Sequence, residues 1–199
     1  FNPLADTIDG VKLDISVVDQ LPSRGFVFDV SGYEEPTGKG DVIVDPESER
    51  LALLRPFAPW KENDFAELLV LVKAKGKCTT DHISPAGKWL EFRGHLDKIS
   101  DNMFSGAVNT FSDKVGKGKN LLTEMEENFS TIARHYQNHD RGWIAVGDTN
   151  YGEGSSREHA AMEPRYLGCR AVLAKSFARI AETNLKKQGI LPLCFVQEN

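Results

Sequence analysis

Short apolar runs and helical stretches alternate between residues 143 and 195, and this alternation limits the possible folds more than any other feature of the chain. The pattern predicts strands at 143–146, 171–174 and 190–195, separated by helices at 155–166 and 179–187. Gly189 stands where the end of a helix favours a left-handed residue. Because strands that alternate with helices form βαβ units, we predict an α/β fold with a parallel sheet. Its functional site is expected at the carboxyl ends of the strands.

The region before residue 143 carries weaker periodic signals. The elements expected there are a strand at 51–54, a strand at 68–74, a helix over 89–102, a polar loop over 112–120 and a helix over 129–137. Ser130 is a candidate cap for the last of these helices.

The first 48 residues differ in composition from the rest of the chain. They are rich in Pro, Gly, Asp and Ser and contain only short apolar runs such as 26–28. This composition is typical of an extended linker. We therefore expect residues 1–48 to be an arm from a preceding domain that lies on another surface, and residues 49–199 to form one domain. The chain starts with Phe1, so we expect a processed form or a piece of a longer protein.

Charge and composition argue against several classes of partner. The formal net charge is -5 at pH 7 and the Lys and Arg residues are spread out, so we expect no nucleic-acid partner. No apolar stretch approaches the roughly 18 residues that span a bilayer, so we expect no membrane partner. The three cysteines, Cys78, Cys169 and Cys194, lack metal-site spacing. We expect them to be buried thiols in a reducing compartment and expect no metal ligands in this chain.

A glycine-rich loop, Gly152–Arg157, follows a predicted strand and precedes a predicted helix. Backbone N–H groups at such a turn attract anions, and the guanidinium of Arg157 suits a carboxylate. The dinucleotide, P-loop and nucleophile-elbow patterns are all absent. Ser155, at the helix N-terminus beside an arginine, could act as a general base because both charges favour its alkoxide. An equally good interpretation is that Ser155 caps the helix and Arg157 pairs with Glu153 or Glu163.

A second polar loop follows the strand predicted at 68–74 and contains Asp81 and His82. The pair could relay a proton or orient a cationic neighbour, and it could equally be a turn carboxylate beside a solvated imidazole. Three other histidines lack metal-ligand spacing and are expected to be structural or solvated: His135, His139 and His159.

Four long segments of the chain resemble the aconitase family, in the C-terminal swivelling domain of its mitochondrial type. The segments are Lys77–Ser84, Phe92–Leu96, Gly147–Ala161, and Ser176–Ile180 continued by Glu182–Gly189. The resemblance covers roughly residues 48–195, and the arm resembles the linker that joins this domain to the three before it. It implies an aconitase-type swivelling β/β/α domain built on the parallel βαβ core.

The resemblance also implies hydro-lyase chemistry that interconverts citrate and isocitrate through cis-aconitate. By this similarity Ser155 is the base that removes the substrate proton, and Ser156 and Arg157 bind a substrate carboxylate. Arg93 would clamp a carboxylate from the other side. Asp81 and His82 complete the candidate catalytic residues, with Asp81 as a partner of cationic groups.

The partners implied by the resemblance are a tricarboxylate substrate and the cluster-bearing domains of the same enzyme. Those domains would ligate a 4Fe-4S cluster that acts as the Lewis acid. The isolated chain is therefore expected to bind tricarboxylates weakly and to be inactive. The resemblance places the enzyme in the mitochondrial matrix.

The sequence departs from the family pattern in three respects. None of the cysteines lies in a cluster motif, and the family's domain continues well past Asn199, so we expect a C-terminal truncation and an unpaired sheet edge. Ala181 replaces a histidine of the family pattern. This departure keeps open a paralogue acting on homocitrate or homoaconitate in lysine biosynthesis. A separate alternative is a non-catalytic anion-binding module that keeps the anion-binding loop.

Overall fold

The computed structural model describes residues 7–8, 11–12 and 29–196. The chain divides into two units, residues 1–42 and 43–199. In the first unit, two short antiparallel strands are described, β1 (Thr7–Ile8) and β2 (Val11–Lys12).

Residues 29–48 contain no helix or strand and are almost entirely exposed. The predicted boundary between residues 48 and 49 stays a prediction, and the apolar run at 26–28 lies outside the described residues.

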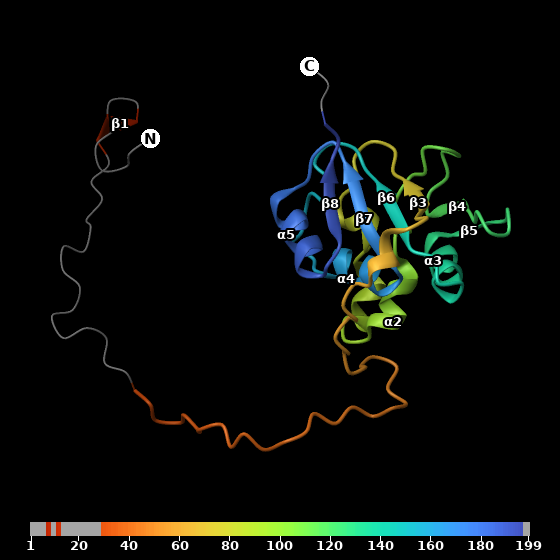
Figure 1. Ribbon diagram of the computed structural model, residues 1–199. Coiled ribbons are helices and arrows are strands. Elements are labelled where there is room, and N and C mark those ends of the chain that lie inside the picture. Colours follow the sequence, from red (N-terminus) through yellow and green to blue (C-terminus); the bar gives the residue numbers. More distant parts are fainter. Residues whose placement is uncertain (1–6, 9–10, 13–28, 197–199) are drawn as a thin grey trace. The chain divides into compact units, whose positions relative to one another are not determined.

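A four-stranded parallel sheet organises the second unit (Figure 1). Its strand order is β3-β6-β7-β8, and every neighbouring pair is parallel. The strands are β3 (Leu69–Lys73), β6 (Trp143–Val146), β7 (Cys169–Ala174) and β8 (Leu191–Cys194). The predicted α/β fold with a parallel sheet is therefore confirmed.

Three helices pack on this sheet. They are α3 (Phe129–Asn138), which contacts β3, α4 (His159–Tyr166), which contacts β7, and α5 (Arg179–Lys187), which contacts β8. The bounds of α5 are those predicted, and Gly189 follows it with a φ of 77°. Helix α4 begins four residues later than predicted. The φ of 113° at Gly154 keeps the chain before it out of a helical path.

Short elements fill the space between these layers. They are the 3₁₀ helices η1 (Glu62–Phe65), η2 (Gly87–Phe92) and η3 (Ser100–Asn102), the helices α1 (Thr80–Ile83) and α2 (Leu96–Ile99), and the antiparallel strands β4 (Lys117–Lys119) and β5 (Glu126–Asn128). No helix in the described part of the chain combines the length and the apolar character needed to cross a membrane.

Four local predictions were wrong. The strand at 51–54 is reduced to one bridge, between Leu51 and Gly94, and its leucine side chains are exposed. The helix over 89–102 is broken into three short turns, and the loop over 112–120 contributes a strand to a hairpin. Ser130 does not cap α3, because Asn128 holds that position and the Ser130 hydroxyl donates to the carbonyl of Asp101.

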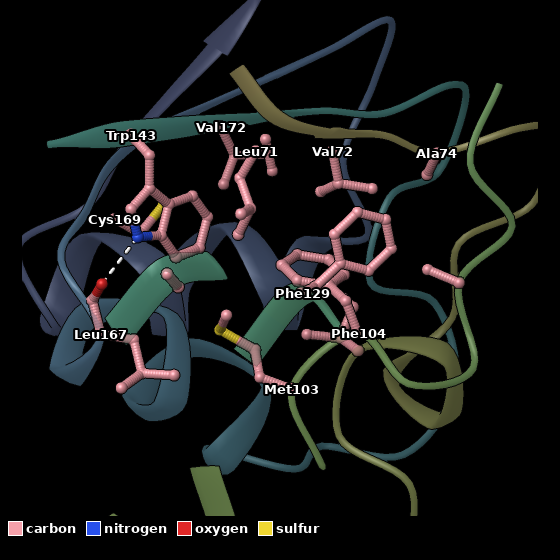
Figure 2. Packing of buried hydrophobic residues seen from close by; sticks show 14 of the residues in the cluster. Leu71, Val72, Ala74, Met103, Phe104, Phe129, Trp143, Leu167, Cys169 and Val172 are labelled. Carbon is pink, nitrogen blue, oxygen red and sulfur yellow. Dashed lines mark hydrogen bonds between the residues drawn. The ribbon is translucent and has the colours of Figure 1, made fainter. Parts of the chain in front are cut away.

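The core lies between the sheet and the helices (Figure 2). The ring of Phe104 makes edge contacts with Phe129 and Trp143, at centroid distances of 6.2 and 6.3 Å. The buried indole of Trp143 donates a 2.6 Å hydrogen bond to the carbonyl of Leu167, which ties β6 to the end of α4. Such pairing satisfies the one polar atom that the indole brings into the core.

Two of the three cysteines are buried, as predicted. Cys78 and Cys169 belong to the core, and burial raises the pKa of the Cys78 thiol to about 12. Cys194 is exposed instead, because it lies on β8 at the edge of the sheet. Leu191 and Leu193 of the same strand are about half exposed.

We expect Phe129→Ala to lower the free energy of unfolding by about 3–5 kcal/mol, because a fully buried ring leaves a cavity. Phe111→Ala is the matched control, since that ring is 74% exposed and its removal should cost within about 0.5 kcal/mol. Urea unfolding of both variants measures the difference. Equal losses would mean that the core lies elsewhere.

Candidate functional site

The loop after β6 lies between two other loops at the carboxyl edge of the sheet (Figure 1). On one side it is joined to the segment after β3. The Gly152 amide donates to the carbonyl of Cys78 at 2.8 Å, and the Thr80 amide donates to the carbonyl of Glu153 at 2.9 Å. An ion pair of 3.0 Å between Lys77 and Glu153 adds to this side.

The segment after β7 holds the other side of the loop. The Tyr151 amide donates to the carbonyl of Ser176 at 2.9 Å, and the Ala178 amide donates to the carbonyl of Tyr151 at 3.0 Å. The Tyr151 ring is buried and packs edge-on against Phe177, at 5.8 Å between centroids. The loop is thus fixed by the same order of strands, β3-β6-β7, that builds the sheet.

Glycine is required at the centre of this loop. Gly152 has a φ of 76°, and a Cβ there would overlap the Cβ of Ala181 on α5. The left-handed conformation and the close contact each disfavour a larger residue. Ala181 therefore packs directly behind the loop that carries the candidate residues.

Ser155 and Ser156 project from the end of this loop and are exposed. Neither hydroxyl forms a hydrogen bond with any residue that the structure describes. The prediction that Ser155 lies at a helix N-terminus is wrong, because α4 starts at His159 with Glu158 in the cap position. The hydroxyl does not cap the helix, and it stands ahead of the helix N-terminus instead of at it.

Arg157 is anchored through a single nitrogen. Its Nη1 donates to the carbonyl of Ser84 at 2.6 Å, to Oδ1 of Asp81 at 2.9 Å and to the carbonyl of Thr80 at 3.2 Å. The expected pairing with Glu153 or Glu163 is not found. Among the described residues, Nε and Nη2 have no partner. This edge is the one that a carboxylate binds with two parallel hydrogen bonds.

Asp81 and His82 face different partners. The Asp81 carboxylate pairs with Arg157, which is the kind of cationic partner that the family resemblance implied. The imidazole of His82 turns back on its own helix, where Nδ1 accepts from the Thr79 amide at 2.9 Å. This places the ring in a capping position, and no hydrogen bond or ion pair joins the side chains of Asp81 and His82 in the described part of the chain.

Arg93 lies at the end of η2, with its carbonyl 3.0 Å from Nε2 of His159, the first residue of α4. Its side chain is exposed and lines a cavity of about 1190 Å³ that also involves residues 52–64. Ser155 and Arg157 do not line this cavity. The structure therefore gathers Asp81, Ser155 and Arg157, and leaves the guanidinium of Arg93 on a neighbouring surface.

One contributor to this site was not identified from the sequence: Ser84, which supplies a carbonyl to Arg157. Glu163 of α4 was considered only as an ion-pair partner of Arg157, and it is fully buried with the Ser84 hydroxyl as its partner. Burial raises the pKa of the Glu163 carboxyl well above its usual range. The one signal in the sequence for a buried carboxyl group was its position in the apolar stretch 160–163. Its partner, Ser84, could not be predicted because it lies 79 residues earlier in the chain.

No group of three or more metal-binding side chains comes together within the described residues. The Cys78 and Cys169 thiols are buried and burial raises the pKa of both, so they do not fit the thiolate ligands of a cluster. The rings of His135 and His139 lie tilted to each other with centroids 4.4 Å apart, and Nδ1 of His139 lies 2.8 Å from the carbonyl of His135.

Comparison with known proteins identifies a family. The family described as "Aconitase C-terminal domain" matches residues 68–198. A probable mitochondrial aconitate hydratase of Dictyostelium discoideum is 55% identical over 203 residues, and one of Caenorhabditis elegans is 50% identical over 200 residues. Each match covers 98% of this chain and 26% of the relative, so the chain spans about a quarter of their length.

One solved structure is also similar, that of a 3-isopropylmalate dehydratase (LeuD) from Methanocaldococcus jannaschii. It is 27% identical and covers 57% of this chain and 52% of its own, with a TM-score of 0.37. A match this partial carries no argument about the site.

We expect Gly152→Ala to destabilise the fold by about 1–3 kcal/mol more than Gly76→Ala, because only the first adds a Cβ that overlaps another side chain. Gly76 has a φ of 64° and nothing within 4 Å of its missing Cβ, so its substitution isolates the conformational cost of about 1–2 kcal/mol. Thermal or urea unfolding compares them. Equal losses of unfolding free energy would show that Gly152 does not pack closely against Ala181.

Proposed function

Since the chain belongs to the aconitase C-terminal domain family, we propose that it is part of a hydro-lyase that interconverts citrate and isocitrate through cis-aconitate. The observation that carries the proposal is the state of Arg157. Its Nη1 is held by Asp81 and two carbonyls, while its Nε and Nη2 have no partner among the described residues. Arg157 lines a small cavity together with Ser155.

In this proposal Arg157 and Ser156 bind one substrate carboxylate. The pair combines a planar fork of donors with a hydroxyl, and carboxylates accept such bonds strongly. Because the side chain of Arg157 is only 16% exposed, its charge is less screened than that of a surface arginine. Asp81 acts by holding the guanidinium in place.

Ser155 is proposed as the base that takes the proton from the substrate carbon onto Oγ. Its support is its exposure and its position two residues before Arg157, whose positive charge favours the alkoxide. The dipole of α4 contributes less than the sequence suggested, because the helix begins only at His159 and the effect falls off within a turn.

Arg93 is proposed to clamp a second carboxylate from the opposite side. The bond between its carbonyl and His159 keeps it near the start of α4, two residues from Arg157. His82 is proposed to support the Asp81 segment through its cap on α1.

The 4Fe-4S cluster that the family resemblance implies finds no ligand set among the described residues. We therefore propose that other domains of the same enzyme ligate it, and we derive no step of the reaction through it. The relatives named above are mitochondrial enzymes, and we propose the mitochondrial matrix for this chain as well.

A second candidate, a paralogue acting on homocitrate or homoaconitate, is favoured by Ala181. Its methyl group, in place of the family's imidazole, packs behind Gly152 and lines a small cavity together with Ser155 and Arg157. An additional methylene changes binding only modestly in an apolar contact, so substrate preference must be measured.

We expect Ser155→Ala to abolish most of the activity when this chain is combined with the cluster-bearing remainder of an aconitase. Loss of a general base should reduce the rate about 10²–10⁴-fold. The assay follows cis-aconitate absorbance with citrate and homocitrate as substrates. The control is Ser105→Ala, another exposed serine, which should leave the rate unchanged. Full activity of the Ser155 variant would contradict the assignment and favour the anion-binding module.

A further inference from the structure

Glu163 lies in the middle of α4, and its side chain is fully buried. Its Oε1 accepts a 2.7 Å hydrogen bond from the hydroxyl of Ser84, and its Oε2 has no partner among the described residues. A buried carboxylate with a single neutral donor would be costly. Burial raises the pKa of the Glu163 carboxyl well above its usual range, against the lowering effects of the Ser84 hydrogen bond and the charge of Arg157.

Ser84 connects this carboxyl to the candidate site. Its hydroxyl binds Glu163, while its carbonyl accepts the shortest of the three bonds from Nη1 of Arg157. Its amide donates to the carbonyl of Thr80, which is a second acceptor for the same nitrogen. The position of Ser84 therefore fixes two of the three acceptors that hold Arg157.

These bonds close a ring. Arg157 and Glu163 are six residues apart on the segment that enters and forms α4, and both contact the one residue that ends α1. Moving the Ser84 segment away from α4 must break the bond to Glu163 or the bond to Arg157. A ring of this kind restricts a long arginine side chain, which otherwise loses substantial rotamer freedom on binding.

We infer that Glu163 is a positioning residue for Arg157: through Ser84 it holds Nη1 in place and leaves Nε and Nη2 available to bind a carboxylate. The effect of this positioning on substrate binding rests on the proposed function. The positioning of Arg157 itself does not require a bound ligand. Glu163 does not touch the substrate in this account. It acts through its hydrogen bond with the Ser84 hydroxyl.

The first test observes Arg157 directly by ¹⁵N NMR of its guanidinium N–H groups in the full chain, without ligand. In the wild type a hydrogen-bonded Nη1–H should exchange slowly with water. Glu163→Gln keeps a neutral acceptor of the same shape and should preserve the signal. Glu163→Leu removes the acceptor and should speed the exchange at least about tenfold. An unchanged Arg157 signal in Glu163→Leu overturns the inference.

A matched pair of serine variants separates positioning from simple loss of stability. Ser84 and Ser100 are both fully buried, and each hydroxyl donates one bond of 2.7 Å. Only Ser84 contacts Glu163 and Arg157. Ser84→Ala should therefore alter the Arg157 signal, whereas Ser100→Ala should destabilise the fold and leave that signal unchanged. Equal effects would overturn the inference, and this pair decides the matter if Glu163→Leu does not fold.

The second test measures citrate affinity of the same variants by calorimetry. Glu163→Leu and Ser84→Ala should weaken binding about tenfold, with Glu163→Gln and Ser100→Ala within about twofold of the wild type. If the wild type binds no citrate while the NMR result holds, the proposed function fails and the positioning role stands. Unchanged affinity in variants whose Arg157 signal is lost would overturn the role in binding.

Discussion

Backbone hydrogen bonds on both sides of the loop after β6 are the constraint on which the candidate site depends. The main chain of 151–153 pairs with residues 78–80 on one side and with residues 176–178 on the other. The three strands that precede these segments are neighbours in the sheet, so the loops that follow them lie side by side. Ser155 and Arg157 follow directly after these residues, so the order of the strands determines where their backbone lies.

A second layer of contacts refines this placement. Ala181 of α5 lies behind Gly152, and the buried pair of Glu163 and Ser84 lies behind Arg157. Ala181 leaves no room for a side chain at Gly152. The pair of Glu163 and Ser84 holds the guanidinium of Arg157 at one nitrogen, Nη1. Rigid support of this kind is what a binding site needs, because each side chain ordered in advance lowers the entropy lost on binding.

Much of the fold could be predicted from the sequence because its signals are local. The strand Trp143–Val146 and the helix Arg179–Lys187 were predicted at their observed bounds, because an apolar run and an amphipathic stretch can each be identified from the local sequence. The start of α4 could not be placed, because it depends on the backbone of Gly154 and on bonds from Arg157 to a segment more than 70 residues away. Contacts at such sequence separation leave no periodic pattern. The roles of the candidate residues came from family resemblance, and they remain proposals.

The measurement that tests this account most directly is a citrate titration of the ¹⁵N-labelled chain, followed through its backbone amides. The account predicts saturable shifts that concentrate at residues 152–157 and around Ser84, and that disappear in Arg157→Ala. Shifts confined to another surface, or the same shifts in that variant, would contradict the claim that this loop and its arginine form the anion-binding site.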